Sequence, residues 1–560
     1  MSSERSRQRR LRSGHTALTA HGEPWVWLTA GCLALAIAMI GGLLALITAR
    51  GIGTFWPVPL QQLDLADGRR LLGEVTEEEK AEPSTPDAAG HPARMLIRTA
   101  GFAETGNHFE WVDESAITST SQPEWATVVE RLDAGRLHGI PRRILHGDEV
   151  VAEGPSEVWA AYEREHPVVR RRWRQAMRLD RVDRGRLQRR LRAARLAVVA
   201  ARLNDGADSA AERAALDQED RIRAEVDEAS QQLDRQTAAL RADNAGWVVE
   251  FETASGNATV VPVDGIVRAW QPNRLGLAGK LGVYGSRWGE FLADDPREAN
   301  SAGGVFPAIW GTVVMTLIMA FLVAPFGVLA ALYLREYSSN GPITAAVRVA
   351  INNLAGVPSI VYGAFGLGFF CYGIGAGIDE LFFKPGLVAD SQPVFGNGGL
   401  LWASLTLALL TLPVVIVATE EALSAVPNSM REGSYACGAG KWQTIRRIVL
   451  PRALPGIMTG LILAMARGAG EVAPLMLVGV KKLALDLPVD STFPFIHPER
   501  EFMHLAYLIY DVGFQSPNSQ AAQPMVFTIT FLLVTIIALL NVTAIWIRSR
   551  LRRRYVAQQF

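Results

Sequence analysis

The chain has 560 residues, and its 56 basic and 56 acidic residues cancel to a formal net charge of zero. Hydrophobic residues make up 49% of the chain and charged residues only 20%, with a mean hydropathy of +0.13. These values exclude both a normal soluble enzyme and a pure membrane bundle, and they indicate apolar blocks joined to one polar region. Cys32, Cys371 and Cys437 are too widely spaced for a CxxC metal site, so we interpret them as small packing residues.

The first apolar block follows a basic N-terminal tail, residues 1–25. Residues 26–48 are long enough to cross a bilayer, which requires about 20 mostly apolar residues. The block is longer than the core of a usual signal peptide, and Thr48-Ala49-Arg50-Gly51 is a poor cleavage site. The sequence therefore predicts a retained transmembrane anchor.

A long polar segment, residues 51–300, comes next. Up to residue 150 it alternates apolar and polar residues in short runs broken by turn signals such as Asp67-Gly68, a pattern typical of antiparallel strands. From about Val168 the apolar residues follow helical spacing on both sides of Asn204-Asp205-Gly206, which predicts an antiparallel helical hairpin. Strand-like sequence returns from Trp247 to Val263. We expect an inserted α+β domain.

The inserted segment carries no sequence pattern for catalysis, and we predict no metal site in the chain. Its arginine run from Arg170 to Arg174 has the composition of a nucleic-acid patch, but acidic residues interleave through the hairpin. Alternating charge is typical of a solvated, ion-paired helix face, so we expect no nucleic-acid partner.

Five more candidate spans fill the C-terminal part of the chain: residues 309–334, 351–374, 400–418, 455–480 and 525–547. Arginines crowd before the first span and after the last, in a C-terminal tail of residues 549–560, and basic residues also fill the loop between the fourth and fifth spans. By the positive-inside rule, both termini and this loop are cytoplasmic, and residues 51–300 are extracytoplasmic. The predicted fold is mainly α: a six-helix polytopic membrane bundle, residues 305–548 plus the first anchor, with the inserted domain outside.

The cytoplasmic loop, residues 419–454, carries a recognisable motif. It resembles the EAA loop of ABC-importer permeases, in which a short helix, a turn at a glycine and a second helix dock into a cleft on the ATPase subunit. The resemblance makes Glu432 the polar docking contact and Gly438 the turn residue, and it predicts that Pro451 stops the segment that follows. Gly433 and Ser434 stand where the family usually has two alanines. The coupling residues are thus Glu432, Gly433, Ser434, Gly438, Ile448, Leu450 and Pro451.

No phosphate-binding GxxxxGK[ST] motif is present, since Gly440-Lys441 is followed by Trp442. We therefore expect no ATPase site or cofactor in this chain, with ATP and Mg²⁺ bound by a partner ATPase.

Arg467 and Glu471 stand one helical turn apart within the fifth candidate span. A charge near the bilayer centre costs at least about 2.5 kcal/mol, so these side chains should face protein or a water-filled path. A guanidinium suits phosphate because its planar fork donates two parallel hydrogen bonds. A purely structural ion pair is the alternative interpretation. On the same helix, small residues at four-residue spacing predict close helix packing: Gly456, Gly460, Ala464 and Gly468.

Together with these motifs, Phe306 to Thr312, Leu334 to Tyr337 and Gly356 to Gly363 resemble the PstA-type permeases of phosphate ABC importers (type I), in a subgroup with a long external loop. The resemblance covers roughly residues 300–555 and the first anchor. It implies a permease subunit in the bacterial inner membrane, paired with a second permease, an ATPase dimer and a periplasmic phosphate-binding protein. It also implies that Arg467 and Glu471 lie on the substrate path. The external domain has no implied role.

Two alternatives remain from the residues alone. A permease for sulfate or molybdate would use the same charged pair, and a membrane-anchored sensor would act through the external domain. A membrane-embedded hydrolase is disfavoured, because no nucleophile is paired with a base.

Overall fold

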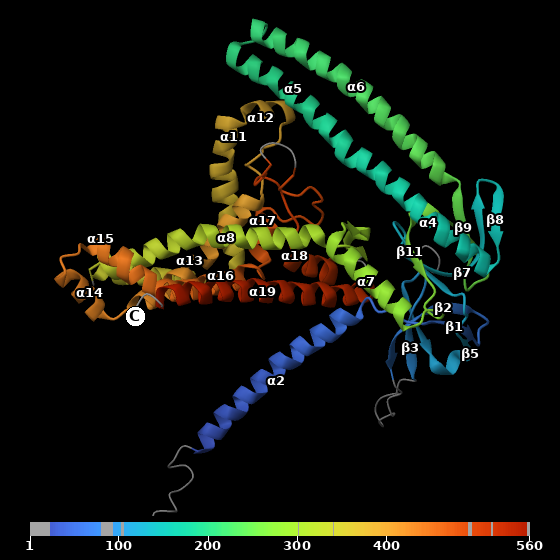
Figure 1. The fold of residues 1–560 in the computed structure, drawn as a ribbon, viewed down its shortest axis with the longest axis horizontal. Coiled ribbons are helices and arrows are strands. Elements are labelled where there is room, and N and C mark those ends of the chain that lie inside the picture. The colour runs from blue at the N-terminus through green and yellow to red at the C-terminus, as the bar shows by residue number, and fades with distance from the viewer. Residues whose placement is uncertain are drawn as a thin grey trace, which may run out of the picture.

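The computed structural model describes residues 23–79, 93–101, 106–300, 302–339, 341–490, 495–516 and 519–556. The arginines predicted to orient the N-terminus lie outside these residues. Within the described part of the chain, six helices are long and apolar enough to cross a membrane. Figure 1 shows the helical bundle with a sheet-containing domain at one end, so the predicted fold class is confirmed.

The spans overlap those expected, and most are longer, but the fifth runs over Lys441–Gly468 rather than over residues 455–480. They are α2 (Glu23–Gly53), α8 (Phe306–Leu332), α10 (Ser359–Phe365) with α11 (Ala376–Phe382), α13 (Leu400–Ser424), α15 (Lys441–Thr444) with α16 (Leu450–Gly468), and α19 (Ser519–Val556). Helix α19 continues to Val556 through most of the basic C-terminal segment, because arginine is a good helix former.

The third span begins at Ser359 rather than at the expected residue 351. Residues Pro342–Leu354 form a separate helix, α9, and the chain turns at residues 355–358 before α10 begins. Pro358 disfavours a helical backbone at Val357, and this explains the break. The apolar run therefore crosses a helix boundary that its hydropathy does not reveal.

Helices α8, α13, α16 and α19 lie side by side in the bundle (Figure 1). Met315, Met319, Leu407, Val415 and Ala464 form part of its buried core. Helix α2 diverges from the bundle, and its apolar residues are exposed. Of the cysteines, Cys371 is buried, whereas Cys32 and Cys437 are exposed, so the expected packing role is wrong for those two.

In the described residues the inserted domain contains two larger antiparallel sheets, and a short antiparallel pair, β12 (Pro296–Arg297) with β13 (Ala302–Gly303), follows them. The first has the order β4-β3-β2-β1-β5, and the second has the order β10-β9-β7-β6-β11 with β8 beside β7. The strands are β1 (Leu60–Leu65), β2 (Arg70–Glu79), β3 (Arg94–Arg98), β4 (Phe109–Asp113), β5 (Ile117–Ser121), β6 (Thr127–Arg131), β7 (Arg136–His146), β8 (Glu149–Glu153), β9 (Trp247–Glu252), β10 (Ala258–Pro262) and β11 (Ile266–Trp270).

Between β8 and β9 the chain forms the predicted helical hairpin from α4 (Pro155–Arg178), α5 (Arg184–Asp205) and α6 (Ala210–Ala245). Gly206 takes a positive φ of 89°, which glycine adopts without strain, and Ser209 caps α6 by accepting a hydrogen bond from the Glu212 amide. The hairpin reaches back over the bundle (Figure 1). There α5 packs on α12 (Lys384–Asp390), and Arg192 Nη2 lies 2.6 Å from an Asp390 carboxylate oxygen.

A further helix, α7 (Leu277–Ala293), connects the second sheet to the bundle. The sequence pattern did not predict it. Its Arg287 donates a hydrogen bond of 3.0 Å to the Phe55 carbonyl just after α2, and its Phe291 belongs to the core that α19 shares. Both ends of the inserted domain are thus packed against the bundle.

Candidate functional site: the α13–α16 loop and the helix break

The loop that carries the motif is shorter than expected, because α13 continues to Ser424 and the next helix starts at Lys441. Within it, Asn428–Ala436 form helix α14. This helix lies at the end of the bundle farthest from the inserted domain (Figure 1). Glu432 and Gly433 are exposed on it, and Ser434 is half-buried. An exposed short helix at a bundle end is available to a partner.

Helix α14 ends in a left-handed turn. Gly438 has a φ of 82° and its amide donates to the Tyr435 carbonyl at 2.9 Å. A side chain at this position would be strained, whereas glycine is not. The turn brings the chain back so that Ser434 and Thr444 hydroxyls lie 2.8 Å apart. The structure therefore places a helix, a glycine turn and a second helix in the predicted order.

A buried ion pair fixes α14 to the bundle. Arg431 Nη2 lies 2.9 Å from Glu336 Oε1, and these side chains are only 12% and 8% exposed. The same guanidinium donates to the carbonyls of Val426 at 2.6 Å and Leu423 at 2.8 Å. Sequence reasoning treats Arg431 only as a positive loop charge. Glu336 lies in Leu334 to Tyr337, one of the stretches that carry the family resemblance. That resemblance is the sequence feature that could have pointed to this ion pair.

The expectation that Pro451 stops the helix is wrong. The helix runs from Lys441 to Gly468 through a π-helical turn at Ile445–Val449, directly before the proline. A proline normally clashes with the carbonyl four residues earlier, and the wider turn leaves room for its ring. Ile448, Leu450 and Pro451 are each half-buried on this continuous helix.

The small residues of α16 face other helices of the same chain. A Cβ atom added at Gly456 would lie 2.5 Å from the Ala422 Cβ, and one at Gly460 would lie 2.5 Å from the Ala418 Cβ, both on α13. Ala464 is fully buried, and Gly468 faces Met319 of α8. The stripe brings α16 into close contact with α13 and α8.

Arg467 and Glu471 do not lie on one continuous helix, which corrects the sequence expectation. Helix α16 ends at Gly468, and a short helix, α17 (Ala473–Val478), follows the break. Pro474 has no amide hydrogen to donate to the Gly470 carbonyl, and glycines 468 and 470 are poor helix formers, so the helix is interrupted here. An interrupted helix at membrane depth is tolerated where protein or water surrounds it.

The charged pair lies at this break. Arg467 Nε is 3.6 Å from Glu471 Oε1, and the side chains are 41% and 21% exposed. That separation is an ion pair but too long for a good hydrogen bond. Within the described ranges, no residue accepts a hydrogen bond from the Arg467 guanidinium, and Glu471 is its ion-pair partner. At 1.5 Å per residue, about 25 Å of helix separates this pair from Leu450 near the loop.

Comparison with known proteins agrees with this geometry. Residues 323–556 match the family described as "Binding-protein-dependent transport system inner membrane component". The phosphate transport system permease protein PstA of Mycobacterium leprae is 42% identical over 32% of this chain and 53% of its own length. PstA of Yersinia pestis is 35% identical over 35% of this chain and 59% of its own length. The probable ABC transporter permease protein YqgH of Bacillus subtilis is 33% identical over 36% of this chain and 62% of its own length.

Residues 323–556 are therefore similar to the inner membrane components of binding-protein-dependent transport systems. Among the curated relatives, this part of the chain is similar in sequence to PstA phosphate permeases. The chain spans about half the length of the Mycobacterium relatives that it matches. A solved MetNI methionine ABC transporter covers 44% of this chain at 20% identity and a TM-score of 0.31, a likeness too low for any further conclusion.

Proposed function

We propose that this chain is the transmembrane permease subunit of an ATP-driven importer that moves inorganic phosphate across the bacterial inner membrane by alternating access. The observation that carries the proposal is the exposed helix α14, held to the bundle by the Arg431–Glu336 pair. Because the Arg431 contacts hold α14 to α8 and α13, a partner that displaces α14 also displaces these two helices. In this proposal the partner is an ATPase dimer, which binds ATP and Mg²⁺, while Glu432 makes the polar docking contact.

The orientation follows from the same assignment. Helix α14 and the inserted domain lie at opposite ends of the bundle (Figure 1), so an ATPase on the cytoplasmic side leaves the inserted domain outside. Both termini are then cytoplasmic. A second permease subunit completes the membrane part, and a periplasmic phosphate-binding protein delivers the substrate.

Arg467 binds the phosphate during its passage, and Glu471 neutralises the guanidinium when the path is empty. Their separation of 3.6 Å supports this exchange, because a loosely held guanidinium gives up its carboxylate at little cost. Sulfate and molybdate present the same tetrahedral oxygens, so the choice of phosphate depends on the similarity to the PstA proteins.

Uptake of radiolabelled phosphate in cells that depend on this transporter tests the proposal. Arg467→Ala should abolish uptake while the subunits still purify together, and Arg467→Lys, which keeps the charge but not the fork, should retain part of it. Glu432→Ala should lose the ATPase subunit on purification, whereas Glu421→Ala, at an exposed position of α13, should keep it. Normal phosphate uptake in Arg467→Ala and Glu432→Ala would contradict the proposal, and uptake of sulfate alone would reassign the substrate.

A further inference from the structure

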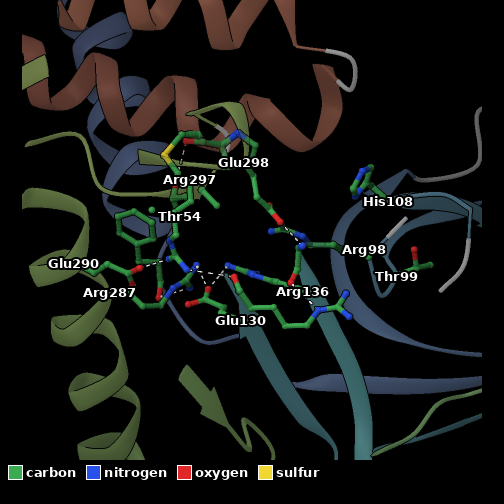
Figure 2. Close-up of a pocket in the computed structure, with 18 residues that line it drawn as sticks. Thr54, Arg98, Thr99, His108, Glu130, Arg136, Arg287, Glu290, Arg297 and Glu298 are labelled. Carbon is green, nitrogen blue, oxygen red and sulfur yellow. Dashed lines mark hydrogen bonds and ion pairs between the residues drawn. The ribbon is translucent and has the colours of Figure 1, made fainter. Parts of the chain in front are cut away.

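A cavity of about 140 Å³ lies where the inserted domain meets the bundle (Figure 2). Thr54 and Phe55 after α2, and Pro524 and Met525 near the start of α19, form its bundle side. The opposite walls come from β3, the β6–β7 turn, α7 and the segment after it. The cavity is therefore placed at the outer ends of two membrane spans, within reach of the membrane surface.

Charged side chains from distant parts of the sequence meet in its walls. Glu130 lies within ion-pair distance of three arginines: Arg136 at 3.1 Å, Arg268 at 3.0 Å and Arg287 at 3.4 Å. Glu290 of α7 also pairs with Arg268, at 3.0 Å. Burial by itself raises the pKa of Glu130, but the arginines, Arg287 first, outweigh it and lower that pKa to about 2. The cluster is thus ionised and electropositive.

Positive charge is in excess in this wall. The described residues that line the cavity include five arginines (Arg98, Arg131, Arg136, Arg287 and Arg297) and three glutamates (Glu130, Glu290 and Glu298). Behind them, Arg268 and Glu74 add one charge of each sign. The excess of two positive charges means that the carboxylates of the described residues do not neutralise the wall.

Arg98 is the side chain with the least compensation. Its guanidinium lies over the Phe109 ring at 5.7 Å, and among the described residues no carboxylate pairs with it. Burial and, after it, the neighbouring Arg136 together lower the pKa of Arg98 to about 9, against the opposing effect of Glu74. An unpaired guanidinium in a partly dry cavity gains the most from an anion, because the site has already lost the water that would screen its charge.

We propose that this cavity binds a phosphate group, supplied by inorganic phosphate or by the headgroup of an anionic lipid, with Arg98 as its main ligand. The volume is close to the roughly 150 Å³ of a protein cavity that holds benzene, so it accommodates one small tetrahedral oxyanion. The planar fork of arginine matches two oxygens of such a group. This site is separate from the Arg467–Glu471 pair in the bundle. The proposal of a phosphate-binding cavity therefore does not depend on whether the bundle transports phosphate.

Binding to the purified full-length complex in delipidated detergent tests the site, with inorganic phosphate as the probe in calorimetry. The Arg467→Ala background removes binding at the helix break, so that failure of this site and failure of the transport proposal are distinguishable. Arg98→Gln should weaken phosphate binding at least about tenfold, the usual effect of losing a charge-assisted hydrogen bond. Arg94→Gln removes a half-buried arginine that lies on the same strand, pairs with Glu79 and does not line the cavity, so this variant should bind like the parent.

Native mass spectrometry after reconstitution with phosphatidylglycerol or phosphatidylcholine separates the two sources. Retention of phosphatidylglycerol that Arg98→Gln abolishes and Arg94→Gln preserves assigns the site to a lipid headgroup, and phosphate binding without lipid retention assigns it to the free ion. Met525→Trp, which fills the cavity without changing its charge, should abolish either kind of binding even if Arg98→Gln misfolds. Unchanged binding of both probes in folded Arg98→Gln and Met525→Trp, or no binding of either probe to the parent, would overturn the proposal.

Discussion

Arg431 and Glu336, 95 positions apart in the sequence, form a largely buried ion pair of 2.9 Å that ties helix α14 to the π-helical turn, Tyr333–Tyr337, that follows α8. Because Arg431 also donates to the Leu423 and Val426 carbonyls, one side chain joins three elements. A force applied to α14 therefore reaches two membrane helices at once.

Arg431→Ala should destabilise the protein by about 3 kcal/mol, because it leaves the Glu336 carboxylate buried without its partner. We expect a lower temperature of thermal unfolding. In the complex with the proposed ATPase partner, we also expect that substrate no longer changes the rate of ATP hydrolysis. Arg335→Ala, which removes an exposed neighbour of Glu336, is the matched control and should change neither quantity. Equal effects of the two substitutions would show that α14 does not depend on the ion pair.

Gly460→Val should force α16 away from α13. The added Cβ would lie 2.5 Å from the Ala418 Cβ, closer than side-chain carbons approach one another, and overpacking of this kind costs about 1–3 kcal/mol. Gly433→Ala is the contrasting substitution, since no atom lies within 4 Å of its new Cβ and alanine favours the helix by roughly 0.5–1 kcal/mol. Thermal unfolding should therefore shift in opposite directions. A stable Gly460→Val protein would mean that the helices pack differently.

Arg192→Asp should loosen the contact between the helical hairpin and α12. The ion pair with Asp390 is exposed, so its loss should cost no more than about 1 kcal/mol, equivalent to a fivefold rise in hydrogen exchange of α12. The double variant Arg192→Asp/Asp390→Arg restores opposite charges and should recover most of the protection. If the double variant exchanges as fast as the single one, the contact does not depend on this pair.

His138 should make the inserted domain less stable in acid. Burial lowers its pKa to about 4 from an ordinary 6.5, an effect that Arg136 and Arg98 reinforce and Glu74 opposes. The unfolded chain binds the proton first, so stability should fall as the pH drops from 6.5 to 4, by roughly 1.4 kcal/mol per unit. His138→Gln should reduce this slope between pH 6.5 and 4.5, above the range in which Glu130 titrates. Hydrogen exchange of β7 at each pH measures the stability of the domain. Equal slopes of stability against pH for the parent and His138→Gln would show that His138 is not the titrating group.

Hydropathy and periodicity predicted the six spans and the helical hairpin, because both are set by residues close together in the sequence. Helix boundaries that depend on single backbone hydrogen bonds were harder to predict. The break after Gly468 lies inside a continuous apolar run, and the missing Pro474 amide hydrogen that favours it does not change hydropathy. The converse holds at Pro451, where a π-helical turn carries the helix past a residue that usually ends one.

The functional geometry was predicted least where it depends on distant residues. Glu432, Gly438 and the small residues of α16 follow a local pattern, and the structure places them on an exposed helix, a left-handed turn and a helix contact. Arg98 and Arg287 are 189 positions apart by their numbers, and only the antiparallel sheet and α7 bring them to one cavity. No spacing rule connects such residues, so the charged cavity was not expected.

Two chain segments connect the inserted domain to the bundle, one after α2 and one before α8. Arg287 donates a hydrogen bond to the Phe55 carbonyl in the first of these segments. A body attached at two points cannot swivel as it would on a single linker. Any change in the angle between α2 and α19 must therefore tilt the whole domain, and the packing of α5 on α12 must carry part of that tilt back to the bundle.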